Sequence, residues 1–237
     1  MRRKGLRGPA AALTRAWLKL RHQILGRRYG RLVLEEIDGV PLLVLPQVFN
    51  PVLLRSGAIL ARTLARLPLV DPAAMTVLDL GTGSGVGAVF AARRGASVVA
   101  VDINPEAVRC ARINALLNQV EHQIEVRQGD LFAPVQGRRF DLVLFNPPFY
   151  RGTPRDDLDR AWRGQDVFER FAGELAGMLT PQGYALVVLS TDGDCDELLA
   201  GLAEAGFSID VVERTNLINE VVSVYSVLPD HAEFVNS

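Results

Sequence analysis

Short apolar runs alternate with helix-length segments from residue 76 almost to the end of the chain. Parallel strands need long crossover connections, so this alternation predicts a mostly parallel sheet with helices on both faces. Only residues 214–220 separate the last two runs, which is too few for a crossover helix, so the final strand should run antiparallel. The runs are 76–80, 97–103, 124–127, 140–145, 184–190, 208–213 and 221–228, and the helical segments are 85–94, 105–118, 166–179 and 194–205.

The residues before this alternation predict a smaller unit that leads into the sheet. Arg31–Ile37 and Val40–Leu45 flank Asp38-Gly39, a typical hairpin signal. Residues 52–67 read as a helix that ends before Pro68. We therefore expect three parts: a basic N-terminal arm or helix over 1–31, a hairpin and helix over 32–70, and the main domain over 71–237.

Charge is distributed unequally along the chain. Residues 1–31 contain ten Lys and Arg and no acid, whereas residues 32–237 contain 16 basic and 27 acidic residues. The basic arm also has apolar residues at helical spacing, namely Leu13, Trp17, Leu20 and Ile24. Such an arm can meet nucleic acid, the ribosome or another anionic surface. It can also pack its apolar stripe on the domain with its charges solvated, which is the interpretation we favour.

Composition narrows the class of protein. The chain is 49% hydrophobic and 22% charged, as in a globular protein with a sizeable core, and it has no apolar run of 18 residues. No secretory signal follows the basic start, and Cys110 and Cys195 make no disulfide framework, so we expect a cytoplasmic protein with reduced thiols. The three histidines are far apart in sequence, so no metal site is expected.

Three predicted strands bring an acidic residue to the same edge of the sheet. The stretch TVLDLGTGSGVG, residues 76–87, contains Asp79 and then a glycine-rich turn that allows close approach of a ligand. The next two strands end at Asp102 and Asp130. Asp102 can accept hydrogen bonds from the ribose hydroxyls of an adenosine-containing cofactor, and Asp130 can accept one from the adenine amino group. Each acid alone could be a turn or cap residue, as Asn104 is expected to be at the next helix. Three together indicate a binding site.

The acidic edge favours a cationic cofactor. A dinucleotide needs its pyrophosphate neutralised, and the dehydrogenase G-x-G-x-x-G spacing fails from Gly81 because the sixth position is Val86. S-adenosylmethionine has no phosphate and carries a sulfonium cation that negative surroundings favour. We therefore expect S-adenosyl-L-methionine as the cofactor. The candidate cofactor-binding residues are Asp79, Gly81, Thr82, Gly83, Gly85, Asp102, Ile103, Asp130, Leu131 and Asn146.

The stretch FDLVLFNPPFY, residues 140–150, ends a core strand on an amide and two prolines. An amide or exocyclic amine nitrogen is a poor nucleophile until acceptors hold its N–H groups. The Asn146 oxygen and the Pro147 carbonyl are candidate acceptors, which the two prolines hold in place. Phe149 can stack on the planar group. The candidate catalytic residues are Asn146, Pro147, Pro148 and Phe149; alternatively, the stretch is only a strand-ending turn with core aromatics.

From about Pro46 to Leu228 the chain resembles class I S-adenosylmethionine-dependent methyltransferases, most closely the HemK-type enzymes. The motifs that carry the resemblance are VLDLGTGSG, VDINPEAV, GDLF, NPPFY and RAWRGQDVFERF. The resemblance implies the Rossmann-like class I methyltransferase fold, a seven-stranded mostly parallel sheet whose last strand is antiparallel. It also implies methylation of a glutamine side-chain nitrogen in a protein such as a translation release factor.

The chain departs from the HemK pattern in ways that leave its acceptor and partners open. The short N-terminal region is similar to family forms that work with a small activator subunit, so such a partner is possible. The upstream segment VFNPVLLRSG lacks the acid and Thr usual in the family, and Phe149 replaces Tyr, as in ribosomal-RNA guanine-N2 methyltransferases. The alternative acceptor is therefore a nucleic-acid base, at adenine N6 or guanine N2. A small-molecule acceptor or a non-catalytic binding module are further alternatives.

Overall fold

The computed structural model describes the hairpin, the sheet and its helices. The described residues are 31–69, 71–148, 150–151, 163–164, 166–191, 193, 195–217 and 220–230. The predicted basic arm, apart from Arg31, and Phe149 of the predicted catalytic segment lie outside them.

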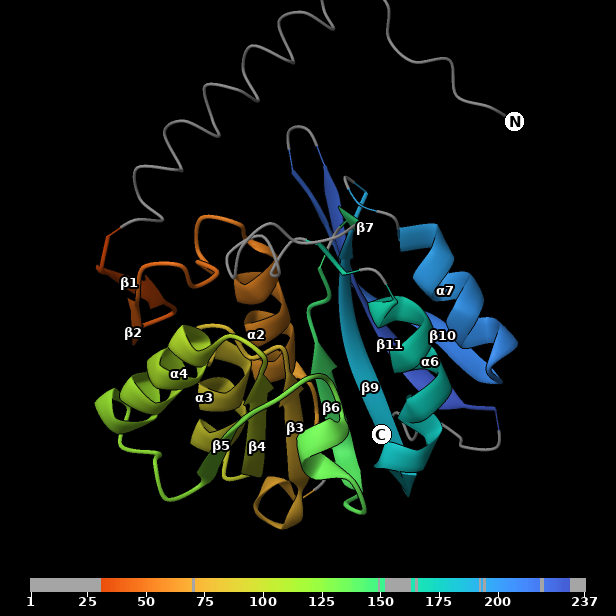
Figure 1. Cartoon of the computed structure of the whole chain (residues 1–237), viewed down its shortest axis with the longest axis horizontal. Coiled ribbons are helices and arrows are strands. Elements are labelled where there is room, and N and C mark those ends of the chain that lie inside the picture. The colour runs from red at the N-terminus through yellow and green to blue at the C-terminus, as the bar shows by residue number, and fades with distance from the viewer. Residues whose placement is uncertain are drawn as a thin grey trace, which may run out of the picture.

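A seven-stranded sheet forms the centre of the molecule, with the strand order β10-β11-β9-β6-β3-β4-β5 (Figure 1). β3, β4, β5, β6 and β9 are parallel, while β11 is antiparallel to both β9 and β10. The predicted α/β class and the reversed last strand are therefore confirmed. The strands are β3 (Thr76–Leu80), β4 (Ser97–Asp102), β5 (Ile124–Gln128), β6 (Phe140–Phe145), β9 (Leu179–Ser190), β10 (Phe207–Asn216) and β11 (Val221–Pro229).

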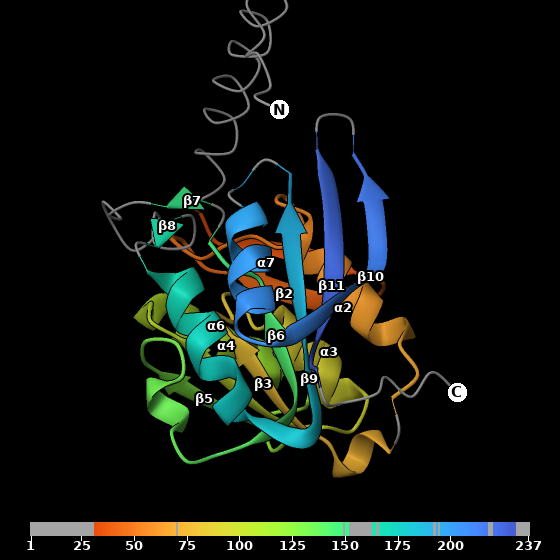
Figure 2. The same ribbon diagram turned by 90° about the vertical axis from the view of Figure 1, so that its right-hand side faces the viewer.

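Helices cover both faces of the sheet (Figure 1 and Figure 2). α2 (Ser56–Arg66), α3 (Val86–Arg93) and α4 (Pro105–Leu117) contribute to the core on one face. α6 (Val167–Met178) and α7 (Cys195–Glu204) pack on the other face. Short 3₁₀ turns lie at Pro72–Ala74 and Ala133–Val135.

Alternate residues of each central strand enter opposite cores. In β4, Val98 and Ala100 pack with α2 and α3, whereas Val99 and Val101 pack with the α6 and α7 side. Because both faces of a parallel sheet are buried, the strands read as continuous apolar runs in the sequence. On the α6 side, Phe171 stacks on Phe132 and Phe145, with ring centroids 5.8 and 4.3 Å apart.

A hairpin of β1 (Val33–Ile37) and β2 (Val40–Val44) packs beside α4 and is held there by two buried amides. Asn118 donates to the Pro41 carbonyl at 2.9 Å, and Asn114 makes the larger set of hydrogen bonds. Asn114 accepts from the Leu43 N–H at 2.7 Å and donates to the Leu43 and Ser84 carbonyls, both at 2.7 Å. Asn114 is fully buried. The amide therefore connects the hairpin to the glycine-rich turn after β3.

Three features differ from the predicted elements. α2 begins at Ser56, whereas the sequence predicted a helix from residue 52, because Asn50 Oδ1 accepts from the N–H groups of Val52 and Leu53 in a turn. β9 begins at Leu179, not at residue 184, because hydrogen bonds extend it through a polar stretch; Thr180 Oγ1 donates to Asp141 Oδ1 of β6 at 2.9 Å. Two-residue strands, β7 (Tyr150–Arg151) and β8 (Arg163–Gly164), pair in parallel after the Asn-Pro-Pro segment. Among the described helices, none has the length and apolarity needed to cross a membrane.

Replacing Asn114 tests the role of this anchor. Asn114→Ala leaves the Leu43 N–H without its partner in a buried setting, so the free energy of unfolding should fall by about 1–3 kcal/mol. Urea unfolding measures the change. Asn216→Ala, at an exposed strand end, is the control and should stay within about 0.5 kcal/mol of the wild type. Equal stability of the two variants would show that Asn114 does not anchor the hairpin.

Candidate functional site

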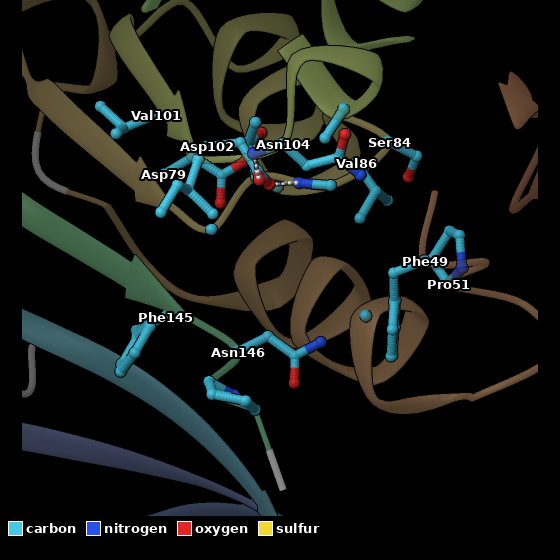
Figure 3. Close-up of a pocket in the computed structure, with 18 of the residues that line it drawn as sticks. Phe49, Pro51, Asp79, Ser84, Val86, Val101, Asp102, Asn104, Phe145 and Asn146 are labelled. Carbon is cyan, nitrogen blue, oxygen red and sulfur yellow. Dashed lines mark hydrogen bonds between the residues drawn. The ribbon is translucent and has the colours of Figure 1, made fainter. Parts of the chain in front are cut away.

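A pocket opens at the carboxyl ends of β3, β4, β5 and β6, the edge predicted from the sequence. Ten predicted site residues line it, while Gly85 and Pro147 do not line it and Phe149 is outside the described residues. Figure 3 shows Asn146 and Phe145 on the side of the cavity opposite Asp102 and Asn104. The ten are Asp79, Gly81, Thr82, Gly83, Asp102, Ile103, Asp130, Leu131, Asn146 and Pro148.

Asp79 organises the glycine-rich turn from beneath. Its Oδ2 accepts from Thr82 Oγ1 at 2.5 Å and from the Ala88 N–H at 2.9 Å, at the start of α3. A Cβ on Gly87 would lie 2.7 Å from Asp79 Oδ1, so only glycine fits there. Burial raises the pKa of Asp79 to about 6. The carboxyl group therefore supports the turn while also lining the pocket.

Gly85 has a packing role. Its φ of +82° is in the left-handed region, and a Cβ there would lie 2.9 Å from Ala111 Cα. The glycine lets α3 start against α4. It supports the pocket without lining it.

Asp102 connects the glycine-rich turn to the start of α4. Its Oδ2 accepts from the Gly83 N–H at 2.8 Å, and its Oδ1 accepts from the Asn104 N–H at 2.9 Å. Burial raises the pKa of this carboxyl, and these N–H groups oppose the shift. The predicted helix cap is confirmed, because the Asn104 side chain accepts from the Glu106 N–H at 2.9 Å.

Sequence reasoning missed the wall formed by the segment before α2. Gln47, Phe49 and Pro51 line the pocket, together with Gly57 in the first turn of α2, and the Asn104 amide donates to the Gln47 carbonyl at 3.0 Å. The sequence VFNPVLLRSG did mark this region, but it lacks the acid and Thr that would have identified it. The contact between Gln47 and Asn104 joins the wall to the cofactor side.

Asn146 carries an acceptor without a partner. Its Nδ2 donates to Ser56 Oγ at 3.2 Å, whereas its Oδ1 is buried and accepts from no described residue. Ser56 is completely buried at the start of α2, so it holds one end of the amide. Leaving a buried acceptor unpaired costs about 1–3 kcal/mol. A ligand that donates an N–H would remove this cost.

The residues of the pocket fit S-adenosylmethionine better than a phosphate-containing cofactor. Three carboxylates and no Lys, Arg or His are among the described lining residues. A sulfonium cation is favoured in such surroundings, whereas a pyrophosphate would have no cationic partner. The turn brings backbone close to the cavity because Gly81 and Gly83 adopt φ of +64° and +55°. The described residues contain no cluster of His, Cys, Asp and Glu that could hold a metal ion.

The raised pKa of Asp79 predicts how stability depends on pH. In the folded protein the Asp79 carboxyl keeps its proton up to about pH 6. In the unfolded chain, where its pKa is near 3.8, it loses the proton at a lower pH. The free energy of unfolding should therefore fall as the pH rises from 4 to 7, with Asp79 contributing roughly 2–3 kcal/mol. In Asp79→Asn, which keeps an acceptor oxygen, this contribution should be absent. Denaturant unfolding of both proteins at several pH values measures the difference, and parallel curves would contradict the assignment.

Comparison with known proteins identifies a family and two informative relatives. Residues 42–217 match the family model for the methyltransferase small domain. A Methanocaldococcus jannaschii protein, assigned provisionally as a protein N5-glutamine methyltransferase, is 33% identical over 80% of this chain and 95% of its own length. The ribosomal RNA small subunit methyltransferase C of Alcanivorax borkumensis is 35% identical over 49% of this chain and 32% of its own.

A solved structure shares the fold. The Thermus thermophilus 16S rRNA N2 G1207 methyltransferase, in complex with AdoMet and guanosine, is 23% identical with a TM-score of 0.60. The match covers 84% of this chain and 50% of that one. The present chain therefore spans half or less of the two RNA methyltransferases but almost all of the M. jannaschii protein.

Proposed function

The chain belongs to the methyltransferase small domain family and is an S-adenosylmethionine-dependent methyltransferase, and we propose that it methylates a glutamine side-chain amide in a protein. The observation that carries methylation of a planar nitrogen is the buried Oδ1 of Asn146, which accepts from no described residue. The M. jannaschii relative, which matches over nearly its whole length, supports a glutamine amide as the group that is methylated. By the resemblance to HemK-type enzymes, a translation release factor is the leading candidate substrate.

The amide clamp addresses the weak nucleophilicity of the acceptor nitrogen. When bound, S-adenosylmethionine supplies an electrophilic methyl group. Asn146 Oδ1 accepts one N–H of the substrate amide, and the Pro147 carbonyl is the proposed second acceptor. Held by two acceptors, the nitrogen is oriented and its lone pair is less delocalised in the transition state. Phe149 is the proposed stacking wall for the planar group.

Ser56 and Phe145 help to keep the Asn146 amide in place. The Ser56 hydroxyl accepts from Asn146 Nδ2, which leaves Oδ1 as the end available to the substrate. Phe145, the preceding residue, is buried and stacks on Phe171 with ring centroids 4.3 Å apart. Because the Asn146 oxygen is already held in place before the substrate binds, less conformational entropy is lost on binding.

The donor side rests on Asp102, Asp130 and the glycine-rich turn. Asp102, held by two backbone N–H groups, is the proposed ribose partner, and Asp130 is the proposed partner of the adenine amino group. Gly81 and Gly83 provide space for the methionine part because they have no Cβ. Asp79 and Gly85 maintain the turn.

Removing the Asn146 amide should separate binding from turnover. Asn146→Ala leaves Asp102, Asp130 and the glycine-rich turn unchanged, so affinity for S-adenosylhomocysteine by calorimetry should stay within about twofold, while kcat should fall by roughly 10²-fold or more. Asn118→Ala is a matched control, because Asn118 is also buried with an unpartnered Oδ1 but lies outside the pocket. Normal turnover by Asn146→Ala would overturn the clamp assignment.

A nucleic-acid base is the second candidate acceptor. Its exocyclic amine has the same planar geometry as an amide, and a base flipped out of its stack could enter the same clamp. The match to a ribosomal RNA methyltransferase and the basic residues 1–31 support this reading. Net negative charge over residues 32–237 opposes it, because affinity for nucleic acid depends on phosphate contacts.

Labelled methyl transfer distinguishes the two acceptors. The protein, with labelled S-adenosylmethionine, is incubated separately with a release factor and with ribosomal RNA. Label on glutamine of the protein is expected, and a variant lacking residues 1–31 should still label it. If only the RNA were labelled, and if both this labelling and the affinity for RNA were lost when residues 1–31 are removed, the nucleic-acid base would be established as the methylated group. A small activator subunit can be added as a further arm if the isolated chain is inactive on both.

A further inference from the structure

Asp130, at the rim of the pocket, is held by a cation from another element. Arg170 Nη1 of α6 donates to Asp130 Oδ2 at 2.7 Å. Asp130 Oδ1 accepts from no residue of the described chain, and Asp130 lines the pocket. Arg170 therefore occupies one carboxylate oxygen and leaves the other one available.

Arg170 is itself held by acidic neighbours. Asp166 Oδ1, at the N-cap of α6, and Glu174 Oε1, one turn after Arg170, each lie 4.0 Å from its guanidinium. The Arg170 side chain is only 33% exposed. Attraction from several carboxylates confines the guanidinium to one place, so its contact with Asp130 is more ordered than that of an isolated surface pair.

The helix that carries Arg170 is rigidly fixed beneath the site. Phe171 is completely buried and stacks on Phe132, two residues after Asp130, and on Phe145, directly before Asn146. Val167, one turn before Arg170, lines the pocket. α6 thus contacts both halves of the site: the rim that carries Asp130 and the strand end that carries Asn146.

From this geometry we infer that Arg170 is a positioning residue that sets the specificity of the pocket for a 6-amino purine. It fixes the Asp130 carboxylate, so that the free Oδ1 accepts from the exocyclic amine of adenine. A 6-oxo purine presents an acceptor at that position, which a carboxylate repels. This inference rests on the proposed adenosine site and is independent of which acceptor molecule is methylated.

The test compares two products that differ at a single group. Calorimetry gives the Kd of S-adenosylhomocysteine and of S-inosylhomocysteine, in which an oxo group replaces the amine. The wild type should prefer the first by roughly tenfold or more, as for a hydrogen bond to a charged acceptor. Arg170→Gln should reduce this preference by roughly threefold or more, within the range of coupling between contacting side chains. The Kd of S-inosylhomocysteine should barely change.

Three variants separate positioning from general stability. Arg170→Lys, which keeps the charge, should retain part of the preference. Asp130→Ala should remove the preference, and adding Arg170→Gln to it should have no further effect, because Arg170 acts through Asp130. Arg138→Gln breaks an ion pair with Glu125 of 2.8 Å whose residues do not line the pocket, and it should leave the preference unchanged.

Two results for the Arg170→Gln protein would overturn the inference. One is an Arg170→Gln protein with the wild-type preference, and the other is an equal loss of affinity for both products, which would indicate a purely structural role. If the wild type bound neither product, the adenosine site itself would be wrong, and the inference would fall with it. Activity on protein or RNA is not part of the readout, so failure of the glutamine proposal would be seen separately.

Discussion

The site is built around a buried hydrogen-bond acceptor that no described residue of the protein satisfies. Native proteins pair nearly all such groups, so an exception inside a pocket indicates a place kept for a ligand donor. Two such groups lie among the described residues that line the pocket: Ser84 Oγ, in the glycine-rich turn, and Asn146 Oδ1, which follows β6 and is the carboxamide oxygen suited to accept from the N–H of a substrate nitrogen. The other residues of the site have two roles: they keep this oxygen in place, and they bind the methyl donor next to it.

Residues from several helices and strands hold the two sides of the site in place. Ser56 of α2 holds the other end of the Asn146 amide, and Phe145 fixes the strand end through its stacking on Phe171. On the donor side, Asp102 joins the glycine-rich turn to α4 through two backbone N–H groups. Because parallel strands end at the same edge, these groups from distant parts of the sequence meet in one pocket.

The fold and the donor edge could be predicted from the sequence because they follow from local patterns. Apolar runs gave the central strands, and a short connection gave the antiparallel last strand. Glycines and acids at strand ends placed the pocket at the correct edge. The position of β9 was less accurate, because the Thr180 to Asp141 hydrogen bond that extends it joins residues far apart in sequence.

The remaining parts of the site depend on tertiary contacts that carry no local signal. Ser56 is an ordinary helix-start residue until folding brings it to Asn146, 90 positions away. From the sequence alone, Arg170 is indistinguishable from a solvated charge on a helix, and only the fold brings it into an ion pair with Asp130. Asp79 was predicted as a cofactor-binding residue; it lines the pocket, and its hydrogen bonds to Thr82 and Ala88 also support the turn. Residue type and spacing do not distinguish such supports from ligands.

A structure of the protein with S-adenosylhomocysteine and a glutamine-containing peptide would test the central claim most directly. The account predicts the glutamine amide nitrogen at about 2.7–3.1 Å from Asn146 Oδ1, the range expected for a stabilising hydrogen bond at the reacting group. A glutamine bound elsewhere, or an Asn146 oxygen turned into the core and paired with another residue of the chain, would contradict it.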